Sequence, residues 1–96
     1  MPLGLRCEGA TADQVAYGIA AAMDVFEAAG VTPEQGAEGI AAREWWDING
    51  FPEECSYYGE QEERWASVWD EAEAAALRAC LGSAQDARGD FALLLV

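Results

Sequence analysis

The sequence predicts a mainly α-helical fold, a compact three-helix domain over residues 1–96 with helices at about 12–29, 33–49 and 60–81. Three observations predict it. Apolar residues recur at helical spacing in these three segments. Each segment opens with a capping residue or a cluster of acids, and each ends at glycine or Asn-Gly. A chain of 96 residues is long enough for one domain.

The first predicted helix begins after Thr11. The Thr11 hydroxyl can accept the amide hydrogen of Gln14, while the Gln14 side chain returns to the Thr11 amide. Gly30 supplies the left-handed residue that ends the helix. The predicted buried stripe, spaced at i, i+4, i+7 and i+11, consists of Val15, Ile19, Ala22 and Phe26 and is widened by Met23.

The second predicted helix opens in the same way, with Thr32 as the cap and Pro33 at a position where its missing N–H costs nothing. Gly36 and Gly39 each weaken this helix by roughly 1 kcal/mol relative to alanine. They indicate either a close helix–helix approach or a helix that depends on tertiary packing. Residues 49–52, Asn-Gly-Phe-Pro, predict its end. Its predicted buried stripe is Ala37, Ile40, Ala41, Trp45 and Ile48.

Residues 53–59 are predicted to form a loop before the third and longest helix. Acids crowd the first turn of this helix, where they favour the positive end of the helix dipole, and Gly82 closes it. Its predicted buried face consists of Trp65, Val68, Trp69, Ala72, Ala76 and Cys80.

The C-terminal segment leaves two alternatives open. Residues 83–86, Ser-Ala-Gln-Asp, are able to cap a short fourth helix. Phe91–Val96 is equally compatible with a strand, and Leu3, Leu5 and Cys7 alternate as a strand would. In the second case the two ends of the chain pair over the helices.

Charge restricts the function classes. Five Arg, no Lys and no His accompany eighteen Asp and Glu, a net charge of −13. Such a surface repels nucleic acid and anionic lipid and attracts basic protein surfaces, so we expect neither direct nucleic-acid binding nor a membrane partner. Without His there is no ordinary imidazole base and no His ligand for a metal, and the sequence predicts no enzyme, no metal and no cofactor.

The cysteines and the N-terminus favour a cytoplasmic protein. Cys7, Cys55 and Cys80 are odd in number and lack metal or redox spacing, which favours reduced thiols over one disulfide and one free thiol. The first ten residues contain no long apolar stretch and do not resemble a signal peptide.

The candidate partner-binding residues are acids of the second and third helices and the aromatic residues among them. Trp46, Tyr57 and Tyr58 are expected to be partly exposed, suited to stacking on arginine. The acids are Glu34, Glu38, Asp47, Glu53 and Glu54, with Glu62, Glu63, Asp70 and Glu73 expected to share the solvent face of the third helix. The alternatives are a solvated acidic surface and aromatic residues that only cover a small core. Mimicry of a nucleic-acid duplex requires most acids to share about a quarter of the surface.

In size and acidity the chain resembles small phage-type inhibitors, the anti-CRISPR and anti-restriction proteins, which occupy basic nucleic-acid-binding surfaces. No motif carries this resemblance, so it assigns no role to any residue. It implies an acidic inhibitor that blocks a basic surface of a nucleic-acid-handling partner. The alternative is a structural or adaptor subunit that acts through helix–helix association or homodimerisation.

Overall fold

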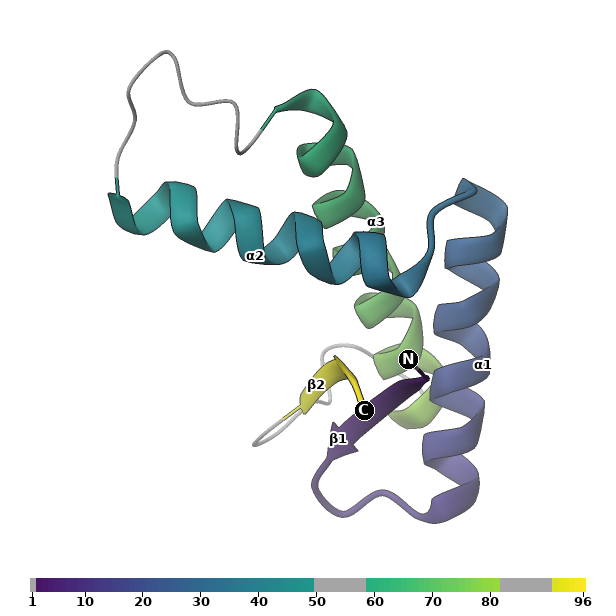
Figure 1. Cartoon of the computed structure of the whole chain (residues 1–96). Coiled ribbons are helices and arrows are strands. Elements are labelled where there is room, and N and C mark those ends of the chain that lie inside the picture. Colours follow the sequence, from purple (N-terminus) through teal and green to yellow (C-terminus); the bar gives the residue numbers. More distant parts are fainter. Residues whose placement is uncertain (1, 50–58, 82–90) are drawn as a thin grey trace.

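The structure is a computed structural model that describes residues 2–49, 59–81 and 91–96. Along the chain the elements are β1 (Leu3–Cys7), α1 (Ala12–Ala29), α2 (Pro33–Asn49), α3 (Glu60–Leu81) and β2 (Phe91–Leu95). The mainly α class is confirmed, and the helix bounds coincide with the predicted ranges. In Figure 1, α1 and α3 lie against each other, α2 crosses α3, and the two strands lie beside the lower ends of α1 and α3.

The predicted helix starts are present as capping boxes. Gln14 N donates to Thr11 Oγ1 at 3.2 Å, and Thr11 N donates to Gln14 Oε1 at 2.7 Å. Thr32 and Gln35 exchange the same two hydrogen bonds at 3.1 and 3.0 Å. Gly30 ends α1 with a φ of 68°, the left-handed conformation that its position requires.

Of the two alternatives for the C-terminal segment, the strand is the one that forms. β1 and β2 pair antiparallel, with Leu3 opposite Leu95 and Cys7 opposite Phe91. Residues 83–86 lie outside the described part of the chain. The pair forms because the inward side chains of both strands join the core, where Leu3 and Leu93 are buried.

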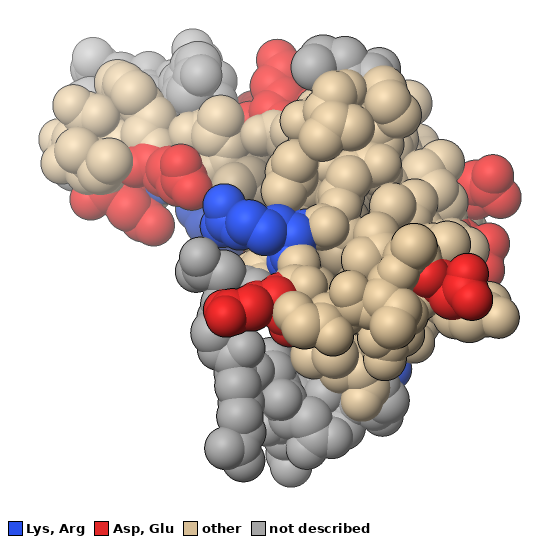
Figure 2. All heavy atoms as spheres, turned by 90° about the horizontal axis from the view of Figure 1, so that it is seen from below, with Lys and Arg blue, Asp and Glu red and all other residues tan. Residues whose placement is uncertain are grey.

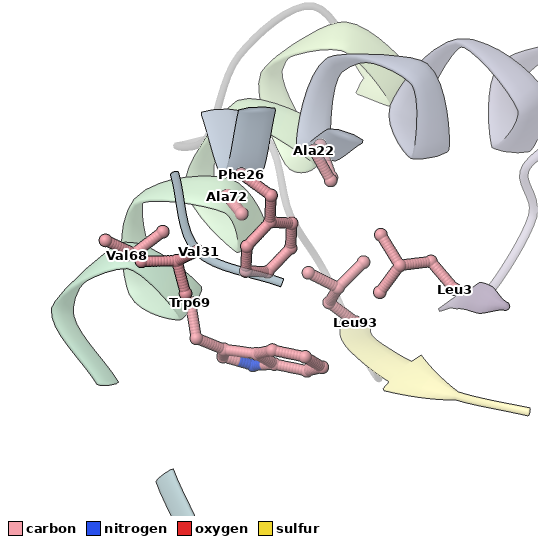
Figure 3. Packing of buried hydrophobic residues seen from close by; sticks show 9 residues of the cluster. Leu3, Ala22, Phe26, Val31, Val68, Trp69, Ala72 and Leu93 are labelled. Carbon is pink, nitrogen blue, oxygen red and sulfur yellow. The ribbon is translucent and has the colours of Figure 1, made fainter. Parts of the chain in front are cut away.

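The core lies between α1 and α3 and is closed by the sheet. Phe26 is 1% exposed, and its ring centroid is 5.9 Å from that of Trp69. Leu3 and Leu93 point toward each other and toward Phe26, so both strands cover this ring pair (Figure 3). The predicted stripes of α1 and α3 therefore face the core as expected.

The predicted buried stripe of α2 is confirmed only in part: Ala37 and Ile40 are half-buried against the core, but the other three residues of the stripe are exposed. The buried residues of this helix are Gly36, Gly39 and Ala42, whereas Ala41 is exposed, Trp45 is 41% exposed and Ile48 is 81% exposed. The cause is a close approach between helices: a Cβ added at Gly39 would stand 2.5 Å from the Ala66 nitrogen of α3. Only the smallest residues fit at that crossing, so the larger apolar residues Trp45 and Ile48 lie on another face.

Candidate functional site

The acids predicted to share the solvent face of α3 divide into two groups. Glu63 and Asp70 are exposed, whereas Glu62 and Glu73 are half-buried and face other parts of the protein. Glu62 Oε1 accepts a hydrogen bond from the Gly59 N–H at 2.9 Å, which caps the helix. The four side chains lie within about 100° of the helix circumference, but only Glu63 and Asp70 are fully open to solvent on this side.

Two of these α3 carboxylates connect the helix to its neighbours. Asp70 Oδ2 accepts a hydrogen bond from Arg43 Nη1 of α2 at 2.7 Å. Glu73 Oε2 accepts the backbone N–H of Leu93 in β2 at 3.0 Å. Both carboxylates therefore have structural partners.

The exposed side of α2 combines apolar and acidic side chains. We call Glu38, Ala41, Glu44, Trp45 and Ile48 the α2 outward face; all five are exposed. At 100° per residue they lie within about a third of the helix circumference. Glu34 is exposed on the same side and already has an electrostatic interaction within the chain. Asp47 is exposed as well, but it points to a different side of the helix.

Trp46 is half-buried, which agrees with its expected partial exposure, and it lies on the side of the helix that carries Ala42. Trp45, which was predicted to be buried, is the more exposed of the two. The remaining predicted residues, Glu53, Glu54, Tyr57 and Tyr58, lie outside the described part of the chain. Sequence reasoning missed Trp45, Ile48 and Glu44 as surface residues because it assigned the first two to the core.

Acidic side chains are spread over the face seen in Figure 2. They stand in separate groups divided by uncharged side chains, and arginine lies among them. On this face the carboxylates do not form one continuous patch.

A groove of about 480 Å³ lies between α2, α3 and β2, and we call it the β2 groove. Its apolar walls include Ala37, Ile40 and Trp69, and residues 93–95 of β2 form one side. From the described part of the chain, three carboxylates and one guanidinium also line it, those of Glu44, Asp70, Glu73 and Arg43. No local sequence signal indicated this groove, because three elements far apart in the chain build it.

Comparisons with protein-family models, curated proteins and solved structures give no match. The site is therefore interpreted from its own geometry. In the described residues no single helix has the length and apolar character to cross a membrane; α1 and α2 reach both only as a pair bent by 87°.

Titratable groups suited to chemistry are few. Within residues 2–49, 59–81 and 91–96, no three Cys, Asp or Glu side chains gather in a way that could hold a metal ion. Cys7 and Cys80 are free thiols. Burial raises the pKa of the Cys80 thiol above its ordinary value, and a hydrogen bond with the Cys7 side chain raises it further. A thiol with a raised pKa is a poor nucleophile at neutral pH.

Proposed function

We propose that the protein is an acidic binding protein of the cytoplasm that occupies a basic, nucleic-acid-binding surface of a partner protein and so inhibits it. The observation that carries the proposal is the α2 outward face, where exposed Trp45 and Ile48 lie next to Glu38 and Glu44. The protein would act by steric and electrostatic occlusion, without turnover and without binding nucleic acid itself.

The apolar pair supplies the anchor of such a contact. Most large apolar side chains of the described residues are at least half-buried, so an isoleucine at 81% exposure on a helix is uncommon here. Tryptophan beside an exposed aliphatic side chain is typical of the few residues that dominate a protein–protein interface. Trp45 is 41% exposed, so part of its side chain is open to contact with a partner.

The carboxylates supply direction and specificity. Glu38 and Glu44 lie on either side of the apolar pair, and a net charge of −13 attracts a basic surface over a longer range. Association should therefore be fast at low salt and should weaken as salt shortens the screening length.

The same face also bears on the alternative of an adaptor or homodimer. Exposed Trp45 and Ile48 favour burial against some surface, which a second copy would also provide. In such a pair, however, Glu38 and Glu44 of both copies would approach one another, a repulsion that a basic partner avoids. The homodimer predicts a mass above 10.3 kDa in solution that rises with concentration.

The first experiment captures partners on the tagged protein from lysate of its native host, at low and at moderate salt. Each captured basic protein is then purified, and its DNA or RNA binding is measured with and without the inhibitor. Because the composition resembles that of anti-CRISPR and anti-restriction proteins, CRISPR effectors and restriction enzymes are tested directly as well. We expect competition with nucleic acid that weakens as salt rises.

Two variants with matched controls locate the contact. Trp45→Ala/Ile48→Ser should weaken partner binding by at least about tenfold, whereas Tyr17→Ala, which changes an exposed aromatic residue of α1, should not. Glu38→Gln/Glu44→Gln is compared with Asp24→Asn/Glu27→Gln, which removes two exposed carboxylates from α1. If both members of each comparison bind alike, the α2 outward face is not the contact.

A further inference from the structure

We propose that the outer edge of β2 accepts an extended, basic segment of a partner polypeptide as a third strand, seated in the β2 groove. This recognition of a segment does not depend on whether the partner handles nucleic acid, and the surface that it uses shares only Glu44 with the α2 outward face.

At alternate residues of β2, the backbone N–H and C=O groups point to the outer edge of the strand. Val96 N donates to the Pro2 carbonyl at 3.0 Å, so the position after β2 still pairs with the chain that leads into β1. Leu93 N–H, three residues earlier, turns away from β1 and donates to Glu73 instead. Because hydrogen-bonded and non-bonded positions alternate in an antiparallel pair, Phe91, Leu93 and Leu95 direct their N–H and C=O groups to the outer edge.

The β2 groove provides space beside that edge. The β2 groove runs along residues 93–95 and is about 480 Å³ in volume, with Ala37 and Ile40 of α2 and Trp69 of α3 on its walls. An added strand would lie about 4.8 Å from β2 and would turn every second side chain toward these walls. Addition of a strand to a free edge is an established mode of peptide recognition, in which the main chain gives affinity and the walls give specificity.

The charge of the residues that line the β2 groove determines which kind of segment it accepts. Among the described residues, Glu44, Asp70 and Glu73 line the groove together with one cation, Arg43, which bonds to Asp70. The groove therefore carries an excess of negative charge beside apolar walls. Its complement is an extended segment that carries both apolar residues and arginine or lysine on the side facing the groove.

Glu73 links the charge to the strand edge. Its carboxylate now holds the Leu93 N–H, the donor that an incoming carbonyl would need. An arginine of the segment would draw the carboxylate into a charge-assisted pair, and the Leu93 N–H would then be open to the segment's backbone. A neutral segment offers Glu73 no new partner, so it would have to displace a charge-assisted hydrogen bond without compensation.

The test uses the full chain and a labelled, end-blocked hexapeptide, Val-Val-Arg-Arg-Val-Val, which presents both residue types on each side of the strand. In the comparison peptides, threonine or glutamate replaces both arginines. In two further valine–arginine peptides, every second amide is N-methylated. One peptide carries the methyl groups on the odd-numbered residues and the other carries them on the even-numbered residues. We expect the basic peptide to bind about tenfold or more tightly than the neutral one, a preference that falls with salt. One methylated register should abolish binding, because alternate amides face β2, and the other should bind like the parent.

Two protein readouts complete the test. Amide hydrogen exchange should show that the Leu95 N–H becomes protected on binding of the basic peptide. Glu73→Gln keeps an acceptor for Leu93 N–H but removes the charge, so the preference for the basic over the neutral peptide should fall about tenfold. Glu27→Gln, an exposed carboxylate on α1, should leave that preference unchanged.

Three results would each overturn the proposal. Equal binding of the basic and neutral peptides would show that the carboxylates do not select the occupant. Equal effects of both methylated registers would show that no strand is added. An unprotected Leu95 amide in a peptide-saturated sample would place the peptide elsewhere. None of these results bears on the α2 outward face, which is tested by its own variants.

Discussion

Gly39 of α2 lies directly against Ala66 of α3. A Cβ added at Gly39 would stand 2.5 Å from the Ala66 nitrogen and 2.6 Å from the Glu62 carbonyl oxygen. Both of these are backbone atoms inside a helix, so neither can move without shifting α3 itself. This contact fixes which face of α2 is buried, and thereby which face carries Trp45 and Ile48.

Gly39→Ala should therefore destabilise the protein, although alanine favours a helix by about 1 kcal/mol over glycine. Overpacking against a rigid backbone costs about 1–3 kcal/mol or more, and we expect the loss to dominate. Urea unfolding measures it, with Ala41→Gly at an exposed position of the same helix showing the propensity effect alone. A Gly39→Ala protein as stable as the parent would mean that the helices do not approach this closely.

Gly30→Ala should destabilise for a different reason. Nothing lies within 4 Å of an added Cβ there, but the φ of 68° places the residue in the left-handed region. A side chain in that conformation costs about 1–2 kcal/mol. Gly30→Asn should lose less, because asparagine tolerates this conformation better. Thermal unfolding of the two variants checks the order, and a reversed order would contradict the left-handed cap.

Asp70→Asn should change the free energy of unfolding by less than about 1 kcal/mol. The Arg43–Asp70 pair is short at 2.7 Å, but the two side chains are 31% and 53% exposed, so water and salt screen it. Unfolding measured at low and high salt, for the parent and the variant, provides the test. A loss well above 1 kcal/mol that does not respond to salt would indicate that this pair is a structural core contact.

The raised pKa of Cys80 predicts a loss of stability in alkali. Burial and the hydrogen bond with Cys7 keep the folded thiol protonated at pH values where the unfolded thiol ionises. The contribution is therefore complete below the unfolded pKa of about 8.5 and is lost as pH rises toward the folded pKa. Unfolding at pH 7.5 and 9.5 should show a larger decline for the parent than for Cys80→Ala. Equal declines would exclude Cys80 as the cause.

Local signals explain what the sequence predicted well. Each capping box is specified by four consecutive residues, Thr11 to Gln14 and Thr32 to Gln35. Both capping boxes form. The prediction for Ala41, Trp45 and Ile48 of α2 was wrong because the deciding contact, between Gly39 and Ala66, joins two helices. Burial of Trp45 and Ile48 was predicted because they are large apolar residues at helical spacing. Spacing alone does not show that a helix crossing admits only glycine and alanine.

The candidate site depends even more on distant parts of the chain. The sequence does not distinguish Glu73 from the other acids of its helix. Its role depends on β2, which places the Leu93 nitrogen 3.0 Å from the Glu73 carboxylate. The strand itself was predicted only as an alternative to a helix, because five residues such as Phe91–Leu95 carry no decisive period. Charge could be counted from the sequence, but the positions where it adjoins apolar surface could not.

The β1–β2 pair also has a consequence for the order of assembly. Leu3 and Leu95 pair across nearly the whole length of the chain, so closing this loop has the largest entropy cost of any contact between the elements. Helix contacts between neighbouring segments have less distance to close and can form first. We therefore expect the sheet to form last and to open first. Its amides should then exchange with solvent as one unit, ahead of those in α1 and α3.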